Sequence, residues 1–437
     1  MKTAAETALA ETFARARSRL PGVGEIAEQR AAAFESFEAR GLPHRRVEEW
    51  KYTDLRALMR DAKPLAPAPD AQAKARAKNA GALLSATGAR RLVFANGAFV
   101  PDLSDLAKLE PGLTIASMAQ ALTQSQDLIA SRLGRAASTD DVAVALNTAF
   151  MGDGALIRIA RDTKLRRPIH LVFCFASEAA AATFTRSLIV VEDGAQATLI
   201  ESHEGPDGLD YQTNTALELF VGDGAHVDHV KIGLEGTRAI HVSSLMASLG
   251  ANARLHDLVY TSGGTVVRNQ SFVRFAGEGA SLLLNGATLI KGRQHVDNTL
   301  VVDHAVAGGF SRELYKSVLE DESRSVFQGK IVVRPGAQKT DGKMMSQALL
   351  LSENAEADNK PELEIFADDV QCGHGATAGA LDPAMLFYLK ARGIPEPEAE
   401  ALLIQAFVGE ALDVIEHEGL KDALAGAVAE WLAARGR

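Results

Sequence analysis

Residues 186–202 read RSLIVVEDGAQATLIES, in which two strand-like apolar runs flank a short turn, EDGA. Similar turns recur further along the chain, as GDGA (222–225), LGAN (249–252), GEGA (277–280) and RPGA (334–337). The glycines of the first four turns, at positions 194, 224, 250 and 279, are 30, 26 and 29 residues apart. Such a loose period is an internal repeat, and repeats of this length are typical of solenoids.

The segments between these turns decide which kind of solenoid is expected. They are short runs of alternating apolar residues, such as SLLLNG (281–286), NTLVVD (298–303) and GKIVVR (329–334). Alternation with a period of two is a strand pattern. Because no helical pattern is interleaved, the units predict a parallel β-helix instead of a helical array. A β-sandwich with regular turns is the alternative that the pattern leaves open.

The N-terminal region has a different pattern. Residues 1–60 carry helical spacing, at Ile26, Arg30, Ala33, Phe34 and Phe37. Gly41, followed by Pro43, predicts the end of that helix. The segment RRVEEWKYTDL (45–55) mixes charge with aromatic residues and predicts an amphipathic segment that docks on another surface. Residues 61–80, rich in alanine, proline and charge, predict an exposed linker, and a short strand is expected at Leu92–Ala95.

The C-terminal region returns to helical patterns. Helices are expected at 381–393 and 395–419, with two prolines at the start of the second, where proline is tolerated. Its apolar stripe is expected at Ala399, Leu403, Phe407, Ala411 and Val414, widened by Leu402, Ala406 and Ile415. Such helices can cap the solenoid, provide a docking surface, or do both. The predicted division is therefore a helical and mixed region (1–150), a β-helix core (151–380) and a C-terminal helical domain (381–437).

Composition limits the classes of function. The 437 residues carry a net charge of −10, which disfavours a nucleic-acid-binding surface. Two cysteines cannot build a disulfide framework, and they indicate a reducing, cytoplasmic compartment. We find no run of the roughly 18 apolar residues that a membrane helix needs, so no membrane partner is expected.

The segment LEIFADDVQCGHGAT (363–377) carries the strongest chemical signal. If its backbone is extended, Cys372 and His374 point to one face, with Cβ atoms roughly 6.5–7 Å apart. A thiolate and an imidazole can share one iron or zinc ion, but two ligands are too few for a closed site. The alternative is a buried cysteine that packs as a small hydrophobe, beside a histidine bonded to the backbone.

Three further patterns are weaker. HVDNTLVVDH (295–304) contains His295, Asp297 and His304, which suit either a metal site or stacked ladders of a repeated strand. GAQKTDGKM (336–344) fails the P-loop pattern, because its glycines are one residue too far apart and Met344 follows the lysine. Asp368 and Asp369 would be the acid and base of a carbohydrate-acting β-helix enzyme, and His295 and His304 the ligands of a cupin-like one.

Three longer motifs carry a family resemblance. SRELYKSVLEDESRSVFQGKIVVRPGAQKTD (311–341), LEIFADDVQCGHGAT (363–377) and LFYLKARGIP (386–395) resemble the SufB/SufD family of iron–sulfur cluster assembly proteins. RRVEEWKYTDL near the N-terminus and the low cysteine content make the likeness closest to the SufD branch, since SufB is more cysteine-rich. The likeness is strongest from residue 191 to residue 418.

The resemblance implies a mainly β fold, with a right-handed parallel β-helix core between an N-terminal helical region and a C-terminal helical domain. It implies a non-catalytic scaffold subunit that pairs with SufB through the β-helices and holds the SufC ABC-type ATPase on its C-terminal helices. The expected SufC-binding residues are Leu402, Leu403, Ala406 and Phe407. Without SufB, the exposed end of the solenoid predicts a homodimer.

The resemblance also assigns a role to His374, which matches the family's functional histidine at the SufB–SufD interface. Transient iron or a nascent iron–sulfur cluster is expected there, and Cys372 stays undecided between ligand and packing residue. No tightly bound cofactor is expected. Reduced flavin is implied for the assembled complex, without a site in this sequence.

Overall fold

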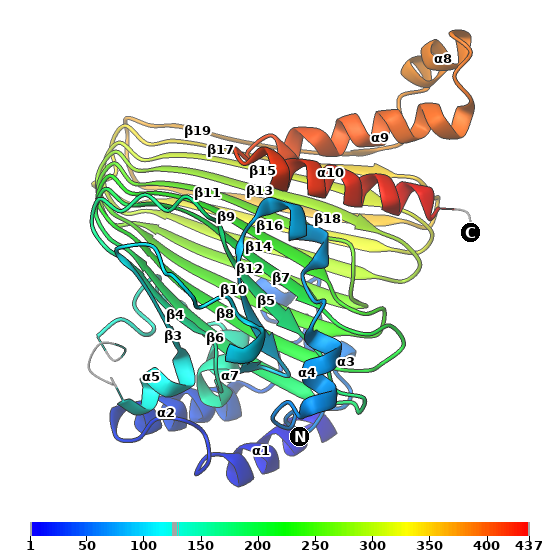
Figure 1. The fold of residues 1–437 in the computed structure, drawn as a ribbon. Coiled ribbons are helices and arrows are strands. Elements are labelled where there is room, and N and C mark those ends of the chain that lie inside the picture. The colour runs from blue at the N-terminus through cyan, green and yellow to red at the C-terminus, as the bar shows by residue number, and fades with distance from the viewer. Residues whose placement is uncertain (1, 125–128, 130, 436–437) are drawn as a thin grey trace.

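The computed structural model describes residues 2–124, 129 and 131–435, and it shows a parallel β-solenoid of about eight turns with helices at both ends (Figure 1). From β4 onwards, even-numbered strands form one sheet and odd-numbered strands the other, so each turn contributes one strand to each sheet. Neighbouring strands within these turns are parallel and in register. The predicted parallel β-helix is confirmed, and the sandwich alternative is wrong because a sandwich needs antiparallel pairs.

The strand bounds define the two sheets. The 9-stranded sheet A contains β3 (Leu113–Ser117), β4 (Ala155–Ile159), β6 (Ala182–Val191), β8 (Gln212–Val221), β10 (Ile240–Leu249), β12 (Val266–Phe275), β14 (His295–His304), β16 (Arg324–Val333) and β18 (Glu356–Ile365). The 10-stranded sheet B contains β2 (Ala98–Phe99), β1 (Arg90–Ala95), β5 (Ile169–Cys174), β7 (Gln196–Glu204), β9 (His226–Leu234), β11 (Arg254–Thr261), β13 (Ser281–Ile290), β15 (Phe310–Leu319), β17 (Asp341–Leu350) and β19 (Gln371–Gly379). Because β1 and β3 join these sheets, the 1–150 region is continuous with the solenoid, and its division from the core stays a prediction.

Helices occupy both flanks of the solenoid. They are α1 (Ala4–Ala16), α2 (Glu25–Arg40), η1 (Glu48–Trp50), α3 (Leu55–Leu58), α4 (Ala71–Ala77), η2 (Ala82–Thr87), η3 (Pro101–Leu103), α5 (Met118–Gln124), α7 (Val142–Phe150), α8 (Pro383–Ala391), α9 (Glu396–Leu412) and α10 (Glu418–Ala433). No helix of the described residues is long and apolar enough to cross a membrane.

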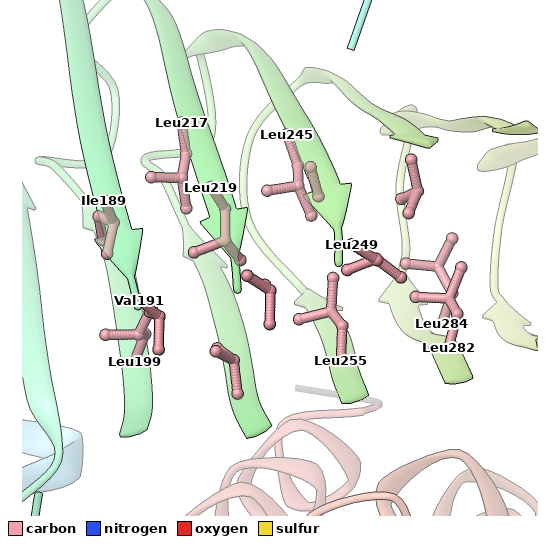
Figure 2. Packing of buried hydrophobic residues seen from close by; sticks show 14 of the residues in the cluster. Ile189, Val191, Leu199, Leu217, Leu219, Leu245, Leu249, Leu255, Leu282 and Leu284 are labelled. Atoms are coloured by element: carbon pink, nitrogen blue, oxygen red, sulfur yellow. The ribbon is translucent and has the colours of Figure 1, made fainter. Parts of the chain in front are cut away.

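The interior of the solenoid is packed by aliphatic side chains that recur at the same register in successive turns. Figure 2 shows Leu217 on β8 beside Leu245 on β10, and Leu255 on β11 beside Leu282 on β13. All four are at most 8% exposed. Burying one such side chain contributes about 1.5–3 kcal/mol, so each added turn extends the core of the turn before it.

The turns from sheet A to sheet B form a ladder of residues in the left-handed conformation. Each has φ between 54° and 71°, and its N–H donates to a carbonyl of the next turn at 2.6–3.3 Å. The members are Asp162, Gly194, Gly224, Asn252, Gly279, Gly308 and Lys339, which are 32, 30, 28, 27, 29 and 31 residues apart. In the LGAN and RPGA turns the equivalent residue is therefore Asn252 or Lys339, and not the glycine that defined the repeat in the sequence. Asparagine tolerates this conformation better than most residues.

The N-terminal helices cover the outer face of sheet A over its early turns. The rings of Phe13 on α1 and Phe34 on α2 stack at 4.1 Å, and both contact Phe150 on α7. This cluster packs against Val242 on β10. The predicted helix with Gly41 at its end is confirmed as α2.

The segment 61–80 is not an exposed linker, and that prediction was wrong. It contains α4, in which Ala73 and Ala77 are buried against Val93 and Val172 of sheet B. Asp70 starts this helix, because its side chain accepts a hydrogen bond from the Ala73 N–H. Alanine-rich composition suggested exposure, but small side chains also allow a helix to lie close to a sheet.

Residues 45–55 form an N-terminal strap that docks across sheet A, as predicted for an amphipathic segment. The Arg268 guanidinium on β12 lies 3.8 Å above the Trp50 ring, and the Trp50 indole donates to Asp141 at 2.8 Å. Farther along the sheet, the Gln328 amide on β16 donates to the Glu49 carbonyl, and the Lys360 ammonium on β18 pairs with Glu48. The strap therefore connects the N-terminal region to the last turn.

The C-terminal helices α9 and α10 lie on the outer face of sheet B (Figure 1). The helix predicted over 395–419 is divided, because α9 ends at Leu412 and His417 caps α10 by accepting from the Leu420 N–H. The buried face of α9 runs through Ile404, Val408 and Leu412. The predicted stripe is confirmed at Ala399, Ala411 and Ile415, which are buried. It was wrong at its centre, where Leu403 and Phe407 are only half-buried, because packing on sheet B turns the neighbouring Ile404 and Val408 inward.

Candidate functional site

Cys372 and His374 lie on β19, the last strand of sheet B, where Cys372 pairs with Gly342 and His374 with Met344. Met344 is 2% exposed and points into the solenoid core, and Cys372 packs against the same core. Because side chains alternate, His374 lies on this inward side as well. It is nevertheless exposed, because no further turn covers the last one.

The Cys372 thiol is not prepared for nucleophilic attack. Burial raises its pKa, and the carboxylates of Asp341 and Glu313 raise it further, while a hydrogen bond from the Gly342 N–H opposes the shift. A thiol with a raised pKa is protonated at neutral pH and is therefore a poor nucleophile. A metal ion would have to displace that proton before Cys372 could act as a ligand.

Cys372 and His374 form at most part of a metal site. Among the described residues, no group of three or more His, Cys, Asp or Glu ligand atoms converges that includes Cys372 or His374. A tetrahedral site needs four ligands, so any ion held here requires ligands from another molecule.

The last turn exposes two strand edges of different character. Among the residues that the structure describes, β18 and β19 each pair with one neighbour only. β18 carries a charged residue at every second position and Pro361 in its middle, and both features discourage further pairing of an edge strand. β19, QCGHGATAG, carries neither a carboxylate nor a lysine or arginine. Ile365 and Phe366, 41% and 59% exposed, lie where β18 ends, so the last turn also exposes apolar side chains at this corner.

The expected SufC-binding residues of α9 differ in accessibility. Leu402 and Ala406 are exposed, Leu402 by 42%, whereas Leu403 and Phe407 are half-buried. The Lys316 ammonium on β15 lies 4.3 Å from the centre of the Phe407 ring, which ties that side chain to the solenoid. Only part of the predicted set is therefore available to a partner.

The helix α8 adds an apolar surface that the sequence reasoning missed. Met385, Phe387 and Tyr388 are 55%, 73% and 52% exposed. Figure 1 shows α8 and the start of α9 projecting beyond the solenoid. The missed signal is the sequence AMLFYL, which is apolar on every side, because a helix with no polar face needs more than one surface to cover it.

Comparison with protein families now decides the identity. Residues 173–407 match the model described as "SUF system FeS cluster assembly, SufBD core domain", and residues 5–171 match the SufBD N-terminal region. The chain belongs to the SufBD family. It is therefore an iron–sulfur cluster assembly protein, as the sequence motifs predicted.

Individual relatives are similar in sequence to this chain over most of its length. An iron–sulfur cluster assembly SufBD family protein of Synechocystis is 31% identical over 410 residues, covering 91% of this chain and 89% of the relative. The iron–sulfur cluster assembly protein SufD of Escherichia coli is 30% identical, covering 90% of both chains. SufD of Bacillus subtilis is 28% identical over 65% of both chains.

His295, Asp297 and His304, the weaker metal candidates from the sequence, each contact other side chains of this SufBD-family chain. The His295 ring bonds to the Thr53 hydroxyl at 2.9 Å, and Asp297 forms an ion pair with Arg268. The His304 ring stacks on Phe275 at 4.1 Å and bonds to Ser311. These separate contacts favour the ladder interpretation over a shared metal ion.

The two remaining candidates lie in turns. Residues 336–340 connect β16 to β17, so no helix follows GAQKTD and the P-loop is excluded, as predicted. Asp368 and Asp369 follow β18, and Asp369 forms an ion pair with Lys339 in the turn ladder. Nothing in this arrangement favours the carbohydrate-acting alternative.

The sequence reasoning also missed a polar half of the solenoid interior. His229 on β9 lies between two buried carboxylates, with Nδ1 2.5 Å from Asp257 and Nε2 3.5 Å from Glu201, and these raise its pKa to about 9 against the effect of burial. Burial lowers the pKa of Lys231 to about 8, and its ammonium donates to Asn269 at 2.8 Å. The sequence did contain a signal for this cluster. Ionisable residues stand at the alternate strand positions that face the core, where the other residues are aliphatic.

Proposed function

We propose that this SufBD-family chain is a scaffold subunit that performs no catalysis itself and acts in a SufB–SufC–SufD complex. Its last solenoid turn pairs with SufB, and its C-terminal helices dock the SufC ATPase. Iron or a nascent iron–sulfur cluster is held as cargo where His374 meets SufB. The observation that carries the proposal is an uncovered, uncharged edge strand, β19, that presents His374 beside an apolar surface.

The two edges of β19 support the proposed pairing with SufB. One edge is bonded to β17, and the other offers backbone N–H and C=O groups that a strand of a second solenoid can pair with. The apolar end around Ile365 and Phe366 would be buried by the same contact. Where SufB is absent, a second copy of this chain offers the same edge, so a homodimer is proposed for the isolated protein.

The incomplete ligand set of Cys372 and His374 supports the proposal that iron or a nascent cluster is held here as cargo. The imidazole of His374 is a good type of ligand for iron, and the Cys372 thiol, whose pKa is raised by burial, is a poorer one. The other ligands, and the thiolate that accepts sulfur, are assigned to SufB. An interface site of this kind opens when the two solenoids move apart, which suits a cluster that must leave.

Docking of SufC is supported by the exposed apolar side chains of α8 and the exposed face of α9. ATP hydrolysis is assigned to SufC, since GAQKTDGKM forms no P-loop in this chain. Nucleotide binding can strain the SufB pair only if SufC contacts differ between the two states. Reduced flavin is proposed for the complex, with no residue of this chain assigned to it.

The edge-pairing proposal is tested by removing a single outward N–H group. The Gln371 N–H donates to the Thr340 carbonyl of the preceding turn, so alternate residues, including Ala376, direct their N–H to the open edge. Ala376→Pro should abolish co-purification with SufB and the homodimer, and circular dichroism should show the solenoid intact. Ala376→Thr, which keeps the N–H, is the matched control. Normal pairing by the proline variant would contradict strand addition at β19.

A further inference from the structure

A second cluster of metal-ligating side chains lies on the outer face of sheet B, apart from His374. His226 and Asp228 are two residues apart on β9 and point to the same outer face, and His256 on β11 is the register partner of Asp228. Glu416 reaches the same point from the connection between α9 and α10. The cluster therefore joins the solenoid to the C-terminal helices.

The ligand atoms are already spaced as around a metal ion. His226 Nε2 is 3.3 Å from Asp228 Oδ1, and His256 Nδ1 is 3.2 Å from the same oxygen. Glu416 Oε1 is 3.8 Å from His256 Nδ1, and one ligand atom from each of the four residues lies within 4.8 Å of the others. A tetrahedron with bonds of 2.0–2.2 Å has edges of about 3.3–3.6 Å, so an ion fits with small side-chain movements.

The polar atoms at this point are poorly satisfied by the protein. His226 Nε2, Asp228 Oδ1 and His256 Nδ1 are buried and make no hydrogen bond of good geometry. The side chains of His226, Asp228 and His256 are 22%, 17% and 16% exposed, whereas that of Glu416 is 62% exposed. Buried polar atoms are normally hydrogen-bonded, whereas these three make only ion-pair contacts of 3.2–3.3 Å with one another, and a cation at their common point would complete the arrangement.

The donor set identifies the class of ion. Two imidazoles and two carboxylates supply two nitrogen and two oxygen ligands, and the carboxylates balance the charge of a divalent cation. Imidazole favours zinc and iron over magnesium and calcium. The T-shaped contact of the His226 and His256 rings, at 4.9 Å and 72°, leaves their nitrogens directed towards Asp228.

We propose that His226, Asp228, His256 and Glu416 bind a divalent transition-metal ion, Zn²⁺ or Fe²⁺, which fastens the α9–α10 connection to sheet B. Three ligands come from two adjacent solenoid strands and are held by their register. The fourth comes from a surface residue that moves with the C-terminal helices. Metal binding therefore sets how firmly these helices are held, independently of whether β19 pairs with SufB.

The test uses the full chain after treatment with a chelator, titrated with Co²⁺ and Zn²⁺. Tetrahedral Co²⁺ gives visible absorption, so the expected result is one equivalent bound with a d–d spectrum, and a rise in Tm with Zn²⁺. The double variant His226→Ala/His256→Ala should lose at least about 100-fold in affinity, since changes even to residues behind a ligand cost 10–100-fold. Its Tm should no longer respond to Zn²⁺.

Two further variants make the result specific. Glu416→Gln changes an exposed side chain and leaves folding intact, and it should weaken binding at least about 10-fold. Cys372→Ser/His374→Ala removes the β19 pair and should leave this site unchanged. Zn²⁺ should also slow trypsin cleavage after Lys421 on α10. Equal binding by wild type and the His226/His256 variant, or the absence of a Co²⁺ spectrum, would overturn the proposal and leave an ion-pair network.

Discussion

The two ends of the solenoid differ in whether other elements of the chain cover them. At the first turns, β2 and β3 close the sheets with antiparallel pairs, and α1, α2 and α7 cover sheet A. At the last turn, β18 and β19 have no further neighbour and apolar side chains stay exposed. A solenoid needs a cover at both ends, and the described residues supply one at the first turns only, which is why pairing with SufB is proposed at the last turn.

The covered end should respond to mutation as a protein core does. Phe34→Ala removes a ring that stacks on Phe13 and makes a T-shaped contact with Phe150, and we expect a loss of about 3–5 kcal/mol in the free energy of unfolding. Urea denaturation measures it. Phe366→Ala at the open end is the counterpart, and it should change stability by no more than about 0.5 kcal/mol. Comparable losses in both variants would remove the distinction between the ends.

Near the open end, the buried carboxyl of Glu313 on β15 should make stability depend on pH. Burial raises its pKa to about 8, against 4.5 in the unfolded chain. Below pH 4.5 the carboxyl is protonated in both the folded and the unfolded chain, so the shift in its pKa costs no stability. As pH rises from 4.5 towards 8, the unfolded chain loses the proton first, and the free energy of unfolding falls. Glu313→Gln should therefore stabilise the protein by about 3 kcal/mol at pH 7 and by little at pH 4.5.

Urea denaturation at several pH values checks this prediction. The exposed Glu322, paired with Arg293 on the surface, provides the matched control, and Glu322→Gln should leave the pH profile of stability unchanged. Parallel profiles for wild type and the Glu313 variant would show that the carboxyl is ionised in the folded protein.

Substitutions on α8 and on the buried side of α9 should affect SufC binding and stability differently. Phe387→Asp places a charge in the proposed dry contact and should weaken SufC binding by about 2 kcal/mol or more, with no change in Tm. Phe407→Asp should weaken binding less and lower the Tm, because its ring contacts Lys316. Binding titrations and thermal melts distinguish the two. Unchanged SufC affinity in the Phe387 variant would place the docking surface elsewhere.

The smallest expected effect on stability belongs to His374. His374→Ala should leave the Tm and SufB pairing unchanged, because an exposed imidazole contributes little to the core. Cluster formation by the assembled complex should nevertheless fall severely, and Cys372→Ser should reduce it less. A normal rate of cluster formation would make His374 a structural residue, and loss of SufB pairing would assign it to packing.

The sequence predicted the solenoid because its turns and alternating strands repeat. Each repeat needs a tight turn and a strand that buries every second side chain, so the same pattern returns. It placed α2 and the strap for the same reason, since their patterns are local. It failed where packing chose between equal patterns. Asn252 replaced a neighbouring glycine in the turn ladder, and α9 turned Ile404 inward in place of Leu403.

The candidate site was predictable only in part. Cys372 and His374 stand two residues apart, so their common face follows from strand geometry alone. The polar interior around His229 and the cluster of Asp228, His256 and Glu416 combine residues from different turns. No spacing within the sequence brings such residues together, because their proximity depends on the register of strands and on where α10 begins.

The N-terminal strap imposes an order on biosynthesis. Glu48 is made early, but its ion-pair partner Lys360 lies 312 residues later in the chain. At about 5–20 residues per second, a ribosome needs roughly 15–60 s to make that stretch. During this interval Trp50 has no Arg268 to stack on until β12 emerges, and the strap closes only when β18 has formed. The last contact of the strap therefore forms only after the solenoid strands up to β18 have been made, and a chain that ends before β18 lacks the ion pair between Glu48 and Lys360.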